Sequence, residues 1–277
     1  MNIVVIMAGG TGQRMAEALN TASNAEKPLP KQFIELENEP ILVKTLSKFI
    51  NSGYFDAFYI GIHEEWADFA DKMLENNLKP QDFTKIHLIS GGKDRNSTLN
   101  NVISAIESDI RDIEASDQAH MSEFAGDLSN FEYGIDPIIV THDAVRPFVT
   151  EKMIEESINA ARQYGAATVA IPTTDTIASS ASRKNDCDEH IREENIVRSM
   201  LDRSTLFNIQ TPQSFRLSYY REAYAKLTLD QVSSLTDVCG VFLSAGLNVS
   251  IVPGDSSNIK ITTPFDLALA KAILSQK

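Results

Sequence analysis

The sequence predicts an α/β protein in which a mostly parallel sheet carries helices on both faces. Short apolar runs alternate along the chain with stretches whose apolar residues recur at helical spacing. The first run, residues 3–7, is apolar throughout, which is typical of a strand that is covered on both faces. Repeated strand–helix units join parallel strands through helical crossovers, so the sheet should lie between two layers of helices.

The individual elements follow from the same alternation. Strands are expected at residues 3–7, 57–62, 86–89, 138–141 and 167–171, and helices at 40–50, 66–74, 98–106 and 150–164. The last helix should follow Thr263, because Thr at the N-cap, Pro264 at the first position and Asp266 at the third form a strong helix start. We expect a single domain over residues 1–277.

Two segments interrupt the alternation. Residues 112–136 are acidic and contain Gly126 and Gly134, which indicates a surface insertion. Residues 173–214 are polar and lack helix–strand alternation, so they are expected to form a long loop or an extended arm.

Composition narrows the class of protein. The formal net charge of -13 argues against general nucleic-acid binding, which needs a basic surface. The acidity is uneven: residues 107–136 hold nine Asp or Glu and one Arg, so a basic phosphate pocket elsewhere remains open. No apolar run approaches the roughly 20 residues that cross a bilayer. Two distant cysteines, Cys187 and Cys239, indicate free thiols, and we expect a cytoplasmic protein.

The first candidate site follows the first strand, in the run MAGGTGQRM (7–15). Glycines let the backbone approach a ligand, and successive N–H groups in a tight turn can hold an anion. A third glycine of the dinucleotide fingerprint is missing, and no Walker lysine follows. Lys31, in PKQF (30–33), and Arg14 add two cations to this phosphate-type loop.

Two further candidate sites also stand where strands end. GGKDRNST (91–98) precedes a predicted helix, whose N-terminal amides favour an anion or polar base edges. THDAVRPF (141–148) runs from a strand into Asp143, a common way to hold Mg²⁺ beside phosphate oxygens. A hydrolytic triad with His142 is disfavoured because no G-x-S-x-G turn is present.

These segments together resemble a known family, the cytidylyltransferases that make CDP-ribitol and CDP-methylerythritol. The resemblance spans essentially the whole chain and continues through Asp175-Thr176, Arg203, QTPQSF (210–215), LTD (235–237) and NIKITTP (258–264). Within the family, MAGGTGQRM, DRNST and THDAVRPF look like the ribitol branch. The methylerythritol branch usually reads A-A-G-x-G-x-R-M at the start and has alanine where this chain has Val145.

The resemblance implies a fold and a reaction. The fold would be a Rossmann-like sheet of the nucleotidyltransferase type with a protruding dimerisation arm, and the protein a homodimer. The reaction would transfer the cytidylyl group of CTP to D-ribitol 5-phosphate with Mg²⁺ and release pyrophosphate, for teichoic acid or a related cell-wall polymer. The alternative acceptor is 2-C-methyl-D-erythritol 4-phosphate.

The resemblance also implies residue roles. Arg14 and Lys31 would be catalytic, and Asp143 would bind the metal. The CTP site would comprise Ala8, Gly9, Gly10, Thr11, Gly12, Arg14, Lys31, Gly91, Gly92, Arg95, Asn96, Thr98 and Asp143. The acceptor phosphate would meet Arg146, Thr176, Arg203, Thr236 and Lys260, with Thr176 and Arg203 serving the partner's site. This chain departs from the family in a longer 16–29 segment, in the 112–136 insertion and in the length of the arm.

Two other classes of protein remain open at this point. A dinucleotide-binding oxidoreductase would need the third glycine and an acidic residue at the end of the second strand, where only Glu64 is available. A non-catalytic nucleotide-binding subunit would bind CTP but release no pyrophosphate.

Overall fold

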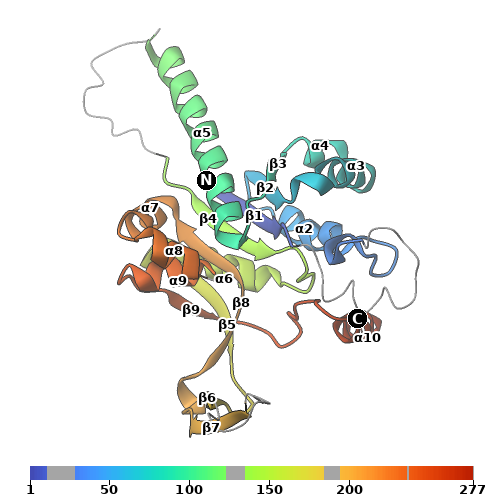
Figure 1. The fold of residues 1–277 in the computed structure, drawn as a ribbon. Coiled ribbons are helices and arrows are strands. Elements are labelled where there is room, and N and C mark those ends of the chain that lie inside the picture. Colours follow the sequence, from blue (N-terminus) through green and yellow to red (C-terminus); the bar gives the residue numbers. More distant parts are fainter. Residues whose placement is uncertain (11–28, 123–134, 184–193, 236, 277) are drawn as a thin grey trace.

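A seven-stranded sheet forms the centre of the computed structural model, which describes residues 1–10, 29–122, 135–183, 194–235 and 237–276 (Figure 1). The strand order is β3-β2-β1-β4-β8-β5-β9. The bounds are β1 Asn2–Ala8, β2 Ala57–Ile62, β3 Ile86–Ser90, β4 Ile138–Asp143, β5 Ala166–Pro172, β8 Phe207–Arg216 and β9 Ser250–Pro253. Only β8 pairs antiparallel with its neighbours, so the predicted mostly parallel α/β sheet is confirmed.

Helices cover both faces of this sheet. In the part of the chain that the structure describes, they are α2 Ile41–Ser52, α3 Ala67–Asn77, α4 Pro80–Phe83, α5 Arg95–Ser122, α6 Glu151–Tyr164, α7 Leu217–Ala225, α8 Leu229–Ser234, α9 Val238–Ser244 and α10 Pro264–Ser275. Short 3₁₀ turns are η1 Lys31–Phe33, η2 Glu64–Trp66 and η3 Arg203–Thr205. No helix among the described residues is both long and apolar enough to cross a membrane.

The two core layers follow from the alternation of side chains along the strands. In β1, Val4 and Ile6 face one way and pack with α2, α3 and α6. Ile3 and Val5 face the other way and pack with α5, α7 and α9. Because β1 is buried on both faces, its sequence has no polar positions to reveal the alternation.

A third, smaller cluster fixes the C-terminal segment beside the sheet. Ile261 packs with Val145, Phe148 and α10, and its backbone N–H donates to the Val145 carbonyl at 3.0 Å. The predicted start of α10 is confirmed, since Thr263 and Asp266 form a reciprocal capping box. This anchoring brings residues 258–261 next to the end of β4.

The arm is shorter than the sequence predicts. A two-stranded antiparallel hairpin of β6 (Ala178–Arg183) and β7 (Glu194–Met200) projects from the sheet (Figure 1). Residues 207–214, assigned to the arm, instead lie in β8, inside the sheet. The polar run of Gln210, Thr211, Gln213 and Ser214 concealed this strand, because these side chains are buried through hydrogen bonds rather than apolar contacts.

The acidic insertion begins as helix rather than as loop. Residues 112–122 continue α5, which extends well beyond the sheet (Figure 1). Its middle, residues 123–134, lies outside the described residues. Where the chain returns, Ile135 donates its N–H to Glu114, and Asp136 accepts from the N–H and hydroxyl of Ser218.

One glycine allows α5 to pack closely on the sheet. A Cβ on Gly61, in β2, would stand 2.6 Å from the Thr98 methyl and 3.3 Å from Val102. The approach to Thr98 leaves no room for a methyl group, and the approach to Val102 is tighter than an ordinary contact. The first turn of α5 therefore lies against the end of β2, which places Arg95 and Thr98 at the edge of the sheet.

Candidate active site

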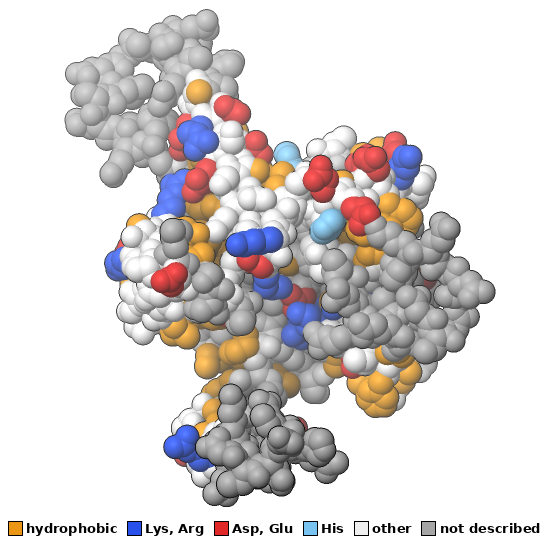
Figure 2. All heavy atoms as spheres, in the orientation of Figure 1, with side chains coloured by type: hydrophobic (Ala, Val, Ile, Leu, Met, Phe, Trp, Pro, Cys, Tyr) orange, Lys and Arg blue, Asp and Glu red, His pale blue; other side chains and the backbone are white. Residues whose placement is uncertain are grey.

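A cavity of about 340 Å³ opens at the carboxyl ends of β1 and β4. This is the edge of an open α/β sheet at which ligands bind. Predicted site residues that line it are Ala8, Gly9, Gly10, Lys31, Gly92, Arg95, Thr98, Asp143 and Lys260. In Figure 2, lysine and arginine side chains gather with carboxylates near the centre of this face. The structure thus brings five separate segments of the sequence into one site.

Gln32 couples the glycine loop to the lysine segment. Its buried Nε2 donates to the Ala8 carbonyl at 2.7 Å and to the Gly10 carbonyl at 3.1 Å. Both contacts hold backbone that follows β1, while Lys31, one residue earlier in η1, lines the cavity. Gln32 also lines the cavity. The sequence predicted no role for Gln32, because the backbone carbonyls that it binds are brought to it only by the fold.

A closed turn shapes the opposite side of the cavity. The Gly92 N–H donates to the Thr98 hydroxyl at 3.0 Å, and that hydroxyl donates to the Asp94 carbonyl at 2.8 Å. Thr98 therefore contributes to the cavity mainly by fixing the turn. Asn96 points away, donating to the Leu235 carbonyl at 2.6 Å, and Gly91 donates its N–H to the end of β2. Asn96 therefore has a structural contact in this structure, and its predicted contact with CTP stays a prediction.

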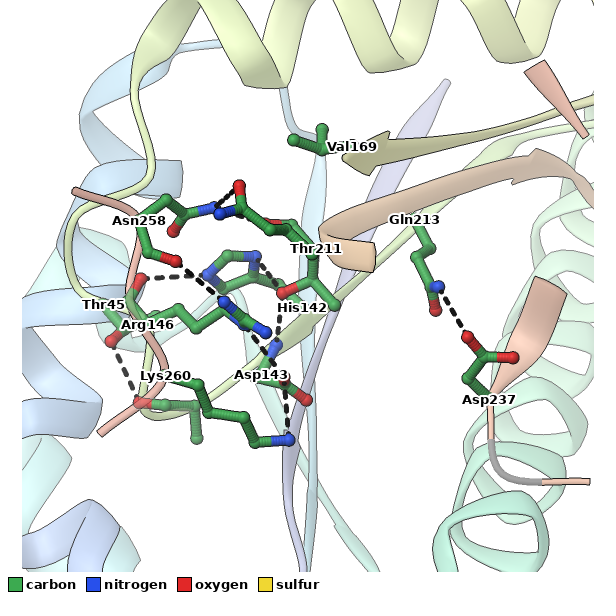
Figure 3. Close-up of polar contacts among 12 residues, drawn as sticks. Thr45, His142, Asp143, Arg146, Val169, Thr211, Gln213, Asp237, Asn258 and Lys260 are labelled. Atoms are coloured by element: carbon green, nitrogen blue, oxygen red, sulfur yellow. Dashed lines mark hydrogen bonds and ion pairs between the residues drawn. The ribbon is translucent and has the colours of Figure 1, made fainter. Parts of the chain in front are cut away.

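Asp143 stands at the centre of the site and pairs with three cations. Its carboxylate oxygens lie 2.6 Å from Arg95 Nη1, 3.1 Å from Arg146 Nε and 3.0 Å from Lys260 Nζ. Arg146 also donates to the Asn258 carbonyl at 2.7 Å (Figure 3). The group retains an excess of two positive charges, which suits it to bind phosphates.

Burial and neighbouring charges shift the pKa of Asp143 in opposite directions. Burial by itself would raise the pKa of this carboxyl, but Arg95, Lys260 and Arg146 hold the pKa well below the ordinary value of 3.8. Asp143 is therefore an anion throughout the physiological range. Arg95 comes from α5, Arg146 from the turn after β4 and Lys260 from the C-terminal segment, so one buried carboxylate joins three parts of the fold.

His142 lies in the core next to Asp143 and contacts the residues that position it. It is fully buried against Phe49, and burial lowers its pKa to about 4. Thr211 Oγ1 accepts from the Asp143 N–H at 3.2 Å and lies 3.0 Å from His142 Nδ1, while Nε2 lies 3.1 Å from the Arg146 carbonyl. These contacts assign the neutral imidazole with its proton on Nε2, donating to Arg146. An imidazole enclosed in the core, with one nitrogen at the Arg146 carbonyl and the other at the Thr211 hydroxyl, does not fit a hydrolytic triad.

A second cavity, of about 170 Å³, adjoins the first and shares Arg95, Asp143 and Lys260 with it. Arg146 lines this second cavity. Thr176 and Arg203 line neither; both are exposed near the root of the arm, where Arg203 donates to the Thr174 carbonyl. Residues Thr11, Gly12, Arg14 and Thr236 lie outside the described residues, so their predicted roles stay predictions.

Comparison with known proteins identifies the family. A sequence model of the 2-C-methyl-D-erythritol 4-phosphate cytidylyltransferase family matches residues 2–120 and 130–276. The chain belongs to this family. It is accordingly a nucleotidyltransferase, of a family that uses CTP and a phosphorylated polyol, and the oxidoreductase alternative falls away.

Solved structures agree with this assignment. The 2-C-methyl-D-erythritol 4-phosphate cytidylyltransferase of Francisella tularensis is 25% identical, with a TM-score of 0.66 over 98% of this chain and 99% of that one. The 4-diphosphocytidyl-2C-methyl-D-erythritol synthase of Anaerococcus prevotii is 22% identical, with a TM-score of 0.65 over 99% and 98%. The Thermus thermophilus cytidylyltransferase is 20% identical, with a TM-score of 0.62 over 99% and 100%.

The ion-pair group yields a prediction for stability. Replacing Asp143 with Asn should lower the free energy of unfolding by about 2–3 kcal/mol at pH 7, because three cations lose their shared anion. Exposure of Lys260 moderates the loss through solvent screening. Since the pKa is depressed in the folded state, this stability is present above the unfolded pKa of about 3.8 and is lost as pH falls further.

Urea titrations at pH 7, 5 and 3.5, without nucleotide or metal, would measure this effect. Asp71→Asn, an exposed change on α3, is the control and should leave stability unchanged. Equal stability of wild type and Asp143→Asn at pH 7 would contradict a central role for the carboxylate.

Proposed function

We propose that this protein transfers the cytidylyl group of CTP to a phosphorylated polyol, with 2-C-methyl-D-erythritol 4-phosphate as the first acceptor to test. The observation that carries this proposal is the pair of adjoining cavities that share Arg95, Asp143 and Lys260. Two polyanions must meet in this reaction, and the cationic group stands where the cavities join.

CTP occupies the larger cavity in this proposal. Its triphosphate lies along the backbone of Gly9 and Gly10, with Lys31 beside it, and its cytidine faces the turn that Gly92 and Thr98 close. The loop held by Gln32 presents backbone rather than side chains to the ligand, which suits close approach of phosphates. Thr11, Gly12 and Arg14 continue this loop and are proposed to complete the triphosphate site.

The acceptor phosphate lies in the smaller cavity, next to Arg146 and Lys260. One of its oxygens attacks the α-phosphorus of CTP in line. The new P–O bond forms as the bond to the bridging oxygen of the β-phosphate breaks, and pyrophosphate leaves. A phosphomonoester is largely dianionic at pH 7, so no side chain has to remove a proton. His142 is enclosed under the site and bonded to Thr211 and Arg146, so it is not placed to take a proton from the acceptor.

Catalysis in this proposal rests on positioning and electrostatic stabilisation. Lys31 and Arg14 neutralise charge that develops on the α-phosphate and the leaving pyrophosphate. Arg95 and Lys260, held in place by Asp143, offset the mutual repulsion of the two substrates.

Magnesium would be held by Asp143 together with the phosphates of CTP. Among the described residues, no three His, Cys, Asp or Glu side chains form a metal-binding group. Both oxygens of Asp143 pair with Arg95, Arg146 or Lys260 in this structure, so the carboxylate would join an ion only by exchanging one of these partners. Phosphates and waters would supply the other ligands that Mg²⁺ needs. Bound there, the ion would neutralise phosphate charge.

Ribitol 5-phosphate is the second candidate acceptor. The family and the solved relatives carry the name of the methylerythritol enzyme, which supports that alternative better than the ribitol prediction. The observation favouring ribitol is local: the glycine loop, the DRNST segment and Val145 look like the ribitol branch. The protein would serve the synthesis of teichoic acid or a related cell-wall polymer only if ribitol 5-phosphate is its acceptor.

An assay of pyrophosphate release separates the two acceptors. With CTP and MgCl₂, we expect turnover with 2-C-methyl-D-erythritol 4-phosphate, and its loss in EDTA. Turnover with ribitol 5-phosphate but not with 2-C-methyl-D-erythritol 4-phosphate would show that ribitol 5-phosphate is the acceptor. CTP binding without pyrophosphate release from either acceptor would indicate a non-catalytic nucleotide-binding subunit.

Lys31→Ala tests the electrostatic part of the mechanism. Loss of one preorganised cation should lower turnover about 100- to 1000-fold, because the cation stabilises charge that grows in the transition state. The thermal unfolding midpoint should stay close to that of wild type. Lys72→Ala, at an exposed position on α3, is the matched control and should keep full activity. Near-normal turnover of Lys31→Ala would remove Lys31 from the mechanism.

We also propose that the arm pairs two copies of the chain. The hairpin exposes Ile196, Val197 and Met200, with Val197 65% exposed, and such apolar surface is costly unless covered. Thr176 and Arg203, near the root of the arm and outside both cavities, would then reach the partner's acceptor site.

Val197→Asp tests this pairing. Sedimentation should show a dimer for wild type and a monomer for the variant, with a lower activity of the monomer. Leu243→Asp, on α9, is the control, since Leu243 is 63% exposed but lies away from the arm. A dimeric and fully active Val197→Asp protein would exclude the arm from the interface.

A further inference from the structure

The smaller cavity has two chemically different walls. One carries the cations Arg95, Arg146 and Lys260 around Asp143. The other carries Gln213, from β8, and Asp237, at the start of α9. Figure 3 shows Gln213 and Asp237 apart from Asp143, Arg146 and Lys260, on the other side of the view. A ligand that spans this cavity therefore meets cations at one end and a carboxylate at the other.

Asp237 differs from Asp143 in its partners. Its Oδ1 accepts from the Gly240 N–H at 3.0 Å, and its Oδ2 accepts from Gln213 Nε2 at 3.2 Å. Within the described ranges no Lys or Arg forms an ion pair with it. Each carboxylate oxygen can accept a further hydrogen bond, so Asp237 retains acceptor capacity at the cavity wall.

Gln213 holds this carboxylate in a fixed position. Its side chain is buried, and its Nε2 is surrounded by acceptors: Asp237 Oδ2, Thr168 Oγ1 at 3.4 Å and Cys239 Sγ at 3.1 Å. The carboxylate fixes which end of the amide faces Asp237, since an ionised Asp only accepts hydrogen bonds and would repel the amide oxygen. Gln213 is thus a positioning residue whose donor aims at the carboxylate.

We infer that Asp237 accepts hydrogen bonds from hydroxyl groups of the acceptor polyol and so determines acceptor specificity. The inference rests on the proposed function and assigns the part of the substrate that the cations do not bind. A carboxylate repels phosphate but binds neutral hydroxyl donors, so the polarity of the cavity orients the acceptor with its phosphate toward Arg146 and Lys260. An acceptor with fewer hydroxyls leaves Asp237 without its ligand.

Asp237→Asn tests this role while retaining the backbone cap, because an amide oxygen can still accept from the Gly240 N–H. We expect kcat/KM for the preferred acceptor to fall about 10- to 100-fold, mainly through KM, since a hydrogen bond to a charged group is lost. The KM for CTP should stay within twofold. Selectivity for the preferred acceptor over glycerol 3-phosphate should fall by a similar factor.

Controls separate specificity from folding. Asp237→Ser also keeps a capping side chain and should reproduce the effect if the Asn variant is unstable. Asp136→Asn removes a carboxylate that accepts from the N–H of Ser218 at the start of α7, and should leave both KM values unchanged. Wild type with an acceptor that lacks one hydroxyl, 2-deoxyribitol 5-phosphate against ribitol 5-phosphate, gives a second readout without any variant if ribitol is the acceptor.

The outcomes distinguish this inference from the proposed function. An active wild type with unchanged acceptor KM in both Asp237 variants would overturn the inference alone. So would an equal loss with the preferred acceptor and with glycerol 3-phosphate, which would indicate a general effect on the site. A wild type that releases no pyrophosphate with either polyol phosphate would overturn the proposed function, and the inference with it.

Discussion

The buried carboxylate of Asp143 is the interaction on which the site depends. Removing a carboxylate from water is costly, and the attraction of Arg95, Arg146 and Lys260 offsets this cost. Such pairs contribute little net stability compared with apolar packing, but they fix geometry. Here the anion holds three cations that would otherwise repel each other, and it keeps them beside the cavities. A single negative charge thereby assembles a positive site.

The rest of the fold brings these cations to the anion. Arg95 arrives because Gly61 lets α5 pack against the end of β2. Lys260 arrives because Ile261 pairs with Val145 and packs beneath α10. The turn after β4 is held from within by His142, whose ring is enclosed by the core. Packing distant from the ligand thus sets the positions of charges that contact it.

The sequence predicted most strands of the sheet and most residues that line the cavity, because both depend on local patterns. Apolar runs reveal buried strands, and glycine or charged motifs at strand ends meet at one edge of the sheet. It failed at β8, where Thr211 and Gln213 are polar yet buried, since their partners lie on distant strands. It also missed Gln32, whose side chain binds backbone carbonyls, and it did not reveal that Asn96 donates to the Leu235 carbonyl. Asp237 stood out only as part of the LTD segment and was given no role, because its contact with Gln213 exists only in the folded chain.

The two aspartates of the smaller cavity have different roles because their hydrogen-bond and ion-pair partners differ. Asp143 pairs with three cations, and the group as a whole carries a net positive charge that faces the acceptor phosphate. Among the described residues, Asp237 has neutral donors as partners, a backbone N–H and the Gln213 amide, and no ion pair that would cancel its negative charge. A molecule with a phosphate at one end and hydroxyls at the other matches this polarity in one orientation only. The same charge separation that draws the acceptor phosphate toward CTP would therefore also align the polyol chain.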